Sequence, residues 1–238
     1  MRNVLINGGS RGIGAELVRV FRSNGYNVVF TYLNSANEAR ILCEQTGSFS
    51  VLADSTRESD VIRAVRYAID TLGSIDCLIN NAGVSSIGLF TDLTLDDWNR
   101  TIAVNLTGAF LYSREVSRYM ISAKQGRIIN ISSMWGISGA SCEVHYSASK
   151  AGLIGMTKAL AKELGPSSIT VNAIAPGVIA TEMNSHLNET EMEALRDDTP
   201  LMRIGAVSDV ASAALFLAGD GASFITGEVL NVSGGFVI

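Results

Sequence analysis

The sequence predicts a single α/β domain in which a doubly wound parallel sheet is covered by helices on both faces, an α/β/α sandwich. Short apolar runs alternate with longer amphipathic stretches along all 238 residues, a pattern typical of repeated right-handed βαβ units. The apolar residues of the short runs are often consecutive, as expected for strands buried on both faces. No linker, internal repeat or low-complexity tract divides the chain.

The expected elements follow one another in strict alternation. Strands are expected at 4–6, 27–32, 48–52, 75–79, 127–131, 169–174 and 228–232. Helices are expected at 12–24, 35–46, 56–72, 94–122, 145–164 and 207–218. Residues 180–206 break this rhythm with polar residues and two short helical patterns. Because ligands bind at strand ends in such sheets, we expect this segment to be a flexible lid over the substrate.

Composition excludes several classes of protein. An apolar share of 47% and a charged share of 17% predict a folded core. A net charge of −5 argues against a nucleic-acid partner. We see no signal peptide and no membrane span, so we expect a cytoplasmic protein. The cysteines are scattered and the histidines do not cluster with other ligands, so free thiols and no metal site are expected.

A glycine-rich turn, NGGSRGIG at 7–14, lies between the first strand and the first helix. Gly8, Gly12 and Gly14 permit a tight turn, close approach to a pyrophosphate and close packing of helix on strand. The spacing differs from the strict G-x-G-x-x-G pattern. Its position favours a Rossmann-type dinucleotide site over a simple turn.

The second strand indicates which dinucleotide would bind. NAD-binding units place an acid near the end of this strand, but here the first acid after the start of the strand is Glu38. Arg11 lies in the glycine turn and is suited to a 2′-phosphate. We therefore expect NADP(H) over NAD(H), the alternative being that Arg11 is only a surface charge.

Tyr146 and Lys150 lie four positions apart in an expected helix, so both point from the same face. A neighbouring cation should lower the pKa of the phenol and prepare it for acid–base chemistry. Alone, such a pair is common on a solvated helix face. His145 is expected to point from the opposite side of the helix, as a lining or solvated residue.

Several ordered motifs together carry a family resemblance. With the glycine turn, Asn80-Asn-Ala-Gly83, Ser133, Tyr146 and Lys150 in view, the whole chain resembles the short-chain dehydrogenase/reductase family. Within that family it looks most like the 3-oxoacyl-acyl-carrier-protein reductases. The resemblance implies a catalytic set of Asn105, Ser133, Tyr146 and Lys150. Ser133 is preferred to Ser132 because it stands thirteen positions before the tyrosine.

The resemblance also implies a division of labour and a mechanism. The cofactor half would be about 1–105 and the catalytic and substrate half about 106–238. A hydride would move from the cofactor to a carbonyl carbon while Ser133 holds the carbonyl oxygen and Tyr146 protonates it. Lys150 would lower the pKa of the phenol and hold the ribose of the cofactor. Asn105 would support a water. The implied cofactor contacts are Gly8, Ser10, Arg11, Gly12, Ile13, Gly14, Asp54 (at the adenine), Asn81, Ala82, Gly83, Tyr146, Lys150, Pro176, Gly177, Ile179 and Thr181.

The substrate is the least determined feature. Reduction of a 3-oxoacyl thioester is the first expectation, with acyl carrier protein as a possible partner. The resemblance implies two basic residues near the active-site mouth that bind the acidic carrier protein. Lys124 occupies the first of these positions, but the second is Ser167. Arg118 and Arg127 could complete a basic rim with Lys124. Bulky Trp135 and acidic Glu143 would also suit an amine-bearing ketone, such as a modified lysine of elongation factor P, or another small ketone.

Two further expectations concern activity and assembly. A non-catalytic dinucleotide sensor is the alternative from another class. The resemblance implies a homotetramer, and the helices at 94–122 and 145–164 carry apolar residues on more than one face, as helices with a second partner do.

Overall fold

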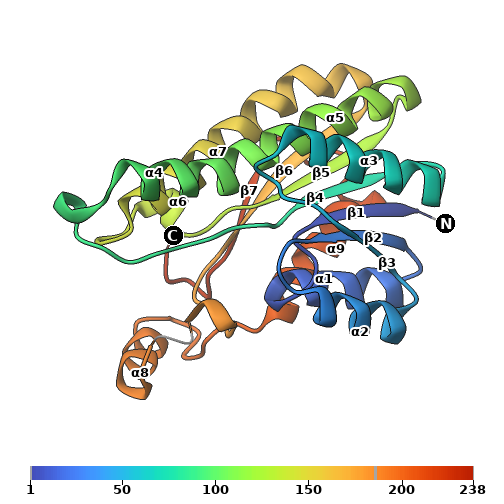
Figure 1. Ribbon diagram of the computed structural model, residues 1–238. Coiled ribbons are helices and arrows are strands. Elements are labelled where there is room, and N and C mark those ends of the chain that lie inside the picture. Colours follow the sequence, from blue (N-terminus) through green and yellow to red (C-terminus); the bar gives the residue numbers. More distant parts are fainter. Residues whose placement is uncertain (1, 185–186, 238) are drawn as a thin grey trace.

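One parallel sheet organises the computed structural model, which describes residues 2–184 and 187–237 (Figure 1). Within these residues the sheet has seven strands in the order β3-β2-β1-β4-β5-β6-β7. The order reverses between β1 and β4, which creates a crevice at the carboxyl ends of these strands. The strands are β1 (Asn3–Asn7), β2 (Asn27–Tyr32), β3 (Phe49–Leu52), β4 (Cys77–Asn80), β5 (Gly126–Ile131), β6 (Ile169–Pro176) and β7 (Val229–Val232).

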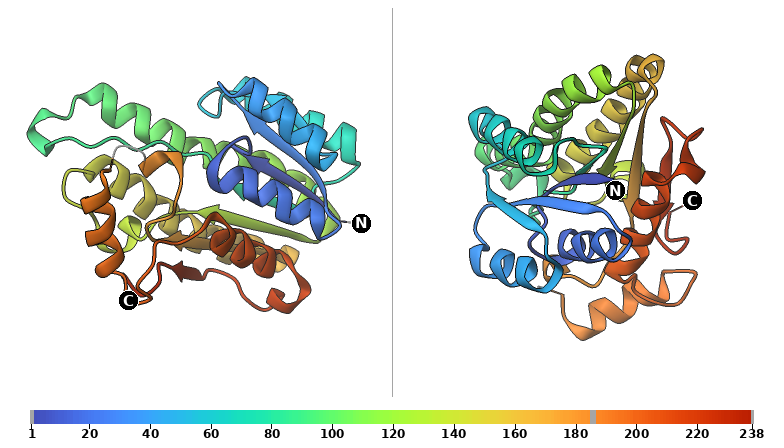
Figure 2. Two further views of the ribbon diagram at one scale, coloured as in Figure 1. Left: turned by 90° about the horizontal axis from the view of Figure 1, so that it is seen from below. Right: turned by 90° about the vertical axis from the view of Figure 1, so that its right-hand side faces the viewer.

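Helices cover both faces of the sheet, as Figure 2 shows. One face carries α1 (Gly12–Ser23), α2 (Ala36–Thr46) and α9 (Val207–Ala218); the other carries α3 (Glu58–Leu72), α5 (Gly108–Ala123) and α7 (Val144–Leu164). The predicted α/β/α sandwich is therefore confirmed. Single helical turns lie at η1 (Phe90–Asp92), η3 (Gly165–Ser167) and η5 (Asp220–Ala222).

The consecutive apolar residues of the strands pack into two separate hydrophobic cores, one on each face of the sheet. In β1, Val4 and Ile6 belong to the core under α1 and α9, whereas Leu5 belongs to the core under α3 and α5. In β5, Ile129 belongs to the core under α1 and α9, and Ile128 belongs to the core under α3 and α5. Because successive side chains of a strand point to opposite faces, a sheet covered on both sides needs apolar residues at every position.

The helix predicted at 94–122 contains an irregularity. It consists of α4 (Leu95–Ile102), a π-helical turn (Ala103–Thr107) and α5. A capping box starts α4: Thr94 Oγ1 accepts from the Asp97 amide at 3.1 Å, and the Asp97 carboxylate accepts from the Thr94 amide at 3.1 Å. Single π-helical turns are frequent at functional sites, and this one carries Asn105.

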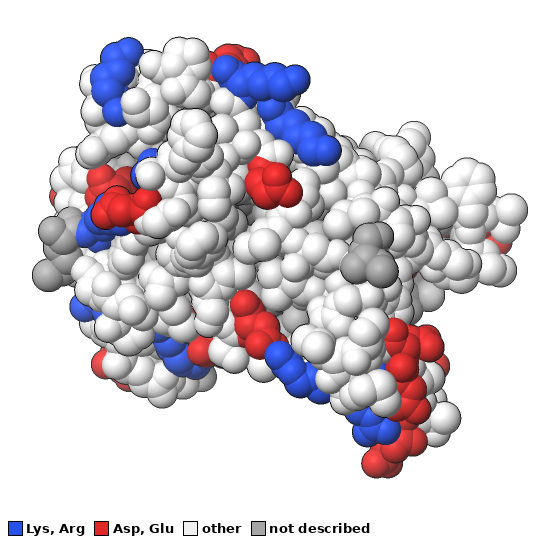
Figure 3. All heavy atoms as spheres, turned by 180° about the vertical axis from the view of Figure 1, so that it is seen from behind, with Lys and Arg blue, Asp and Glu red and all other residues white. Residues whose placement is uncertain are grey.

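The segment 180–206 forms the two short helical elements that its sequence predicts. These are η4 (Glu182–Asn184) and α8 (Glu189–Asp197), which projects from the body of the molecule (Figure 1). Positions 185 and 186 of the expected lid lie outside the described residues. Acidic side chains gather over α8, as the rear view in Figure 3 shows.

Two smaller findings complete the description of the fold. The segment after β5 contains a short helix that was not expected from the sequence, α6 (Trp135–Ser138). In the described part of the chain, the helices are too short or too polar to cross a membrane.

Candidate active site

The loops after β1 and β4 meet so closely that only glycine fits at two positions. Gly8 has a φ of +76°, and a Cβ there would lie 2.8 Å from Ala82 Cα. A Cβ on Gly14 would lie 2.0 Å from the carbonyl oxygen of Gly8. Asn81 joins the two loops, since its Nδ2 donates to that same oxygen at 2.7 Å. The glycine turn and the NNAG segment thus form one tightly packed unit at the crevice.

The amino end of α1 faces this unit and fits an anion. Among the described residues, no side chain caps the helix, whose N-cap is Arg11, and its first turn has no acidic residue. The first amides of the helix therefore keep free N–H groups at the positive end of its dipole. This donor set matches a dinucleotide pyrophosphate.

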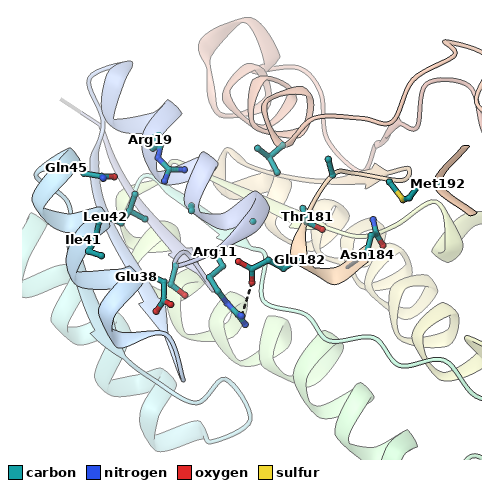
Figure 4. Close-up of a pocket in the computed structure, with 15 residues that line it drawn as sticks. Arg11, Arg19, Glu38, Ile41, Leu42, Gln45, Thr181, Glu182, Asn184 and Met192 are labelled. Atoms are coloured by element: carbon teal, nitrogen blue, oxygen red, sulfur yellow. Dashed lines mark hydrogen bonds and ion pairs between the residues drawn. The ribbon is translucent and has the colours of Figure 1, made fainter. Parts of the chain in front are cut away.

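A cleft of about 770 Å³ opens beside the amino end of α1 (Figure 4). Four of the expected cofactor residues line it: Ser10, Arg11, Gly12 and Thr181. It is also lined by residues for which the sequence analysis assigned no contact, among them Arg19, Glu38, Gln45, Glu182 and Asn184.

Arg11 is not a free cation in this cleft. Its Nη1 lies 3.0 Å from Glu182 Oε2, in an ion pair between the start of α1 and η4 (Figure 4). Sequence reasoning missed this pair because its members are 171 positions apart.

The other expected cofactor residues lie along the same edge of the sheet. Asp54 follows β3, and its Oδ1 accepts from the amide and hydroxyl of Thr56 at 2.9 and 2.7 Å. Pro176 ends β6, and Gly177 packs so closely that a Cβ would lie 2.7 Å from Ser233 Cα. Carboxyl ends of parallel strands thus bring distant segments to one crevice.

Asn105 joins three parts of the site. Its Oδ1 accepts from the Val84 amide at 2.8 Å, and its Nδ2 donates to the Val84 carbonyl at 2.9 Å and to Ser149 Oγ at 3.0 Å. The π-helical turn therefore ties the loop after β4 to α7. Asn105 is buried, so these bonds satisfy polar groups that water cannot reach.

Lys150 is almost completely buried on α7, and its Nζ donates to the Ile131 carbonyl at 2.9 Å. Burial lowers the pKa of this lysine to about 8, because the low-polarity surroundings disfavour its charge. A Cβ on Gly83 would lie 3.3 Å from Nζ and 3.5 Å from Asn105 Oδ1. Glycine at 83 thus keeps the space around both polar atoms open.

Tyr146 responds to burial in the opposite direction. Burial raises the pKa of its phenol to about 12; interaction with the Ser133 hydroxyl lowers it, and the negative charge of Glu143 raises it further. Lys150 Nζ lies 5.6 Å from the ring centroid. The expectation of a lowered pKa for this phenol is wrong here, because desolvation of the phenolate is the largest influence on it. Tyr146 is consequently a protonated donor at neutral pH.

The two serines after β5 have different surroundings. Ser132 Oγ donates to the Lys150 carbonyl at 3.0 Å and so supports α7. Ser133 interacts with the Tyr146 phenol, and its Oγ accepts from the Trp135 amide at 3.1 Å.

The loop after β4 is also clamped to the start of α7. Ser85 Oγ donates to the Glu143 carboxylate at 2.6 Å, and Ser86 Oγ lies 2.8 Å from His145 Nε2. His145 is fully buried, so the solvated role, one of the two expected for it, is wrong. The sequence around Ser85 and Ser86 does not indicate these contacts, because their partners lie 58 and 59 positions away in the chain.

Within one chain, the basic rim expected around Lys124 does not lie at the mouth of the candidate active site. Lys124 and Ser167 precede β5 and β6, at the amino edge of the sheet, whereas Ser133 follows the carboxyl end of β5. Six extended residues span roughly 20 Å, so the two edges are well separated. Arg118, on α5, is paired with Glu115 at 3.1 Å.

The sandwich, the glycine turn and the buried group of Asn105, Ser133, Tyr146 and Lys150 define a dinucleotide-binding oxidoreductase. A family model described as enoyl-(acyl carrier protein) reductase matches residues 8–237. The chain belongs to the short-chain dehydrogenase/reductase family, whose members act on a carbonyl or hydroxyl group.

Individual relatives share nearly the whole chain. It is 39% identical over 236 residues to the 3-oxoacyl-[acyl-carrier-protein] reductase FabG of Aquifex aeolicus, covering 97% of this chain and 95% of the relative. It is 40% identical over 240 residues to the 3-oxoacyl-[acyl-carrier-protein] reductase of Synechocystis sp., covering 98% and 96%. A solved structure of a mutant Serratia marcescens short-chain dehydrogenase/reductase matches with a TM-score of 0.92 and 38% identity, covering 99% and 97%.

Proposed function

We propose that this protein reduces a 3-oxoacyl thioester to the 3-hydroxyacyl thioester with NADPH. The observation that carries the proposal is the buried group of Ser133, Tyr146 and Lys150, in which Lys150 Nζ lies 5.6 Å from the Tyr146 ring centroid, beside the crevice where a dinucleotide fits. Relatives named 3-oxoacyl-[acyl-carrier-protein] reductases, 39% and 40% identical, support the substrate class.

The glycine turn, the amino end of α1 and Thr181 would hold the cofactor. Arg11 would hold its 2′-phosphate, because a guanidinium matches phosphate and β2 ends without an acid. Lys150 would donate to the ribose. The bound cofactor supplies the hydride that reduces the carbonyl carbon.

The side chains of the protein manage the charge and the proton. Ser133 donates to the carbonyl oxygen, where negative charge develops. Tyr146 then transfers its proton to that oxygen. Lys150 keeps an ammonium near the phenol below its pKa of about 8 and so favours the phenolate left behind. Asn105 holds the loop after β4 and Ser149 in place, as a positioning residue.

The test is NADPH oxidation with acetoacetyl-coenzyme A, with the acyl-carrier-protein thioester as a second substrate. We expect turnover of both. The variant Tyr146→Phe removes the phenolic hydroxyl that carries the transferable proton, so it should lose about 10²–10⁴-fold in rate while NADPH affinity stays within a few-fold. The proposed substrate class would be contradicted if neither thioester is reduced while amine-bearing or other small ketones are. Tyr146 is not the acid if the Phe variant keeps more than about a tenth of the activity.

A further inference from the structure

The ion pair between Arg11 and Glu182 lies where the proposed cofactor would place its 2′-phosphate. We propose that Glu182 competes with this phosphate for Arg11, so that binding of NADPH releases the turn after β6 from the start of α1. This inference rests on the NADPH assignment made under the proposed function. It makes Glu182 a residue that tunes cofactor affinity.

Geometry makes the competition direct. Arg11 and Glu182 line the same cleft from opposite sides and meet at 3.0 Å across it (Figure 4). Their side chains are 58% and 72% exposed, so an anion from solvent can reach the guanidinium. Exposed ion pairs are weak, typically worth no more than a few-fold in an equilibrium constant. A stronger ligand can therefore displace the carboxylate.

The 2′-phosphate is such a ligand. A phosphate monoester carries a charge of about −1.5 to −2 at neutral pH and can bind a guanidinium through two parallel hydrogen bonds. A carboxylate held on the same guanidinium would repel it. NADH lacks this phosphate and leaves the ion pair in place.

Other charged residues of the cleft allow a direct effect of Glu182 to be separated from a general effect of charge. The cleft is lined by two arginines and two glutamates, Arg11, Arg19, Glu38 and Glu182. Arg19 is paired with Glu16 of its own helix at 3.5 Å. Glu38 lines the cleft from α2 and is not the partner of Arg11 in its ion pair, so its removal changes the charge of the cleft without breaking the Arg11–Glu182 pair.

The turn that carries Glu182 is anchored at its base. Ala180 and Gly205 are joined by a backbone hydrogen bond of 2.8 Å, Gly205 and Val178 by another of 2.9 Å, and Asn184 Nδ2 donates to the Ile179 carbonyl at 2.8 Å. Release of Glu182 would therefore loosen the tip of the turn while its base stays in place.

Binding measurements on two matched variants test the competition. Fluorescence titration should show that Glu182→Gln binds NADPH about two- to five-fold more tightly than the wild type, with NADH affinity unchanged. Glu38→Gln removes the same charge from the same cleft and should change NADPH affinity less. Equal gains in the two variants would overturn direct competition in favour of a general charge effect.

Hydrogen–deuterium exchange of a peptide covering residues 178–184 gives a readout independent of affinity. The cofactor-free Glu182→Gln protein should exchange this peptide faster than the cofactor-free wild type. In the wild type at saturation, NADPH should protect the peptide less than NADH does, because both cofactors would contact Thr181 but only NADPH would release Glu182. If the wild type does not prefer NADPH, the cofactor assignment and this inference fall together. If it prefers NADPH but Glu182→Gln shows neither tighter binding nor faster exchange, only the competition is refuted.

Discussion

Burial acts on the two central ionisable side chains in opposite directions. It raises the pKa of the Tyr146 phenol to about 12 and lowers that of the Lys150 ammonium to about 8. Both shifts have one cause, because a low-polarity environment disfavours whichever form carries charge. The site therefore keeps the phenol protonated and brings the pKa of the lysine closer to neutral pH, at which it still carries its charge.

The shifted lysine predicts a pH dependence of cofactor binding. In the cofactor-free protein Lys150 carries its charge below pH 8 and loses it as the pH rises through about 8. If an anionic cofactor favours the charged form, NADPH affinity should fall above this pH, by up to about tenfold per pH unit. Titrations between pH 7 and 9.5 measure this slope.

Two variants on α7 show whether Lys150 causes the slope. Lys150→Met should bind NADPH more weakly at pH 7 and lose the pH dependence between 8 and 9.5. Lys158→Met removes an exposed cation from the same helix and should retain it. The assignment fails if both variants keep the wild-type slope.

At the level of elements, the π-helical turn between α4 and α5 connects the catalytic helix to the loop after β4. The apolar pattern of the sequence predicts a helix over residues 94–122, but it does not predict the wider, π-helical turn at Ala103–Thr107. That turn presents the buried amide of Asn105 to both backbone groups of Val84 and to Ser149. The irregularity is thus tied to the geometry of the site.

We expect Asn105→Ala to destabilise the fold as well as slow the reaction. The change leaves the part-buried amide and carbonyl of Val84 without their partners, which should cost about 1–3 kcal/mol in the free energy of unfolding. Urea denaturation measures this loss. Asn99→Ala, at an exposed position of α4, should stay within about 0.5 kcal/mol. Equal stability of the two variants would show that the Val84 clamp contributes little.

At the scale of the whole molecule, large apolar side chains remain exposed. On α5, Phe110, Tyr119 and Ile121 are each about two-fifths exposed, and Phe224 near the carboxyl terminus is fully exposed. Exposed apolar side chains on one helix are candidates for a surface that binds another protein. They support the proposal of a homotetramer made from the family resemblance.

Light scattering at micromolar concentration tests this assembly. We expect four chains in the wild type and a smaller particle for Phe110→Asp, since a charge at an apolar interface is costly to bury. An unchanged far-ultraviolet circular dichroism spectrum would show that the variant is still folded. A monomeric wild type would refute the proposal.

The sequence by itself determined the fold and the chemistry that its motifs carry. Strands buried on both faces need continuous apolar runs, and the expected strand at 27–32 matches β2 residue for residue. The helix at 207–218 was equally readable from its pattern. The i, i+4 spacing of Tyr146 and Lys150 follows from helix geometry alone.

Only the tertiary structure decided the electrostatics and the long-range pairs. The pKa of Tyr146 depends on everything packed around it, so burial could reverse an expectation based on one neighbour. The Arg11–Glu182 pair joins segments 171 positions apart, and Lys124 lies at the far edge of the sheet because of the direction of β5. Local patterns record which residues are buried, whereas distances between segments and the resulting desolvation arise only when the chain is folded.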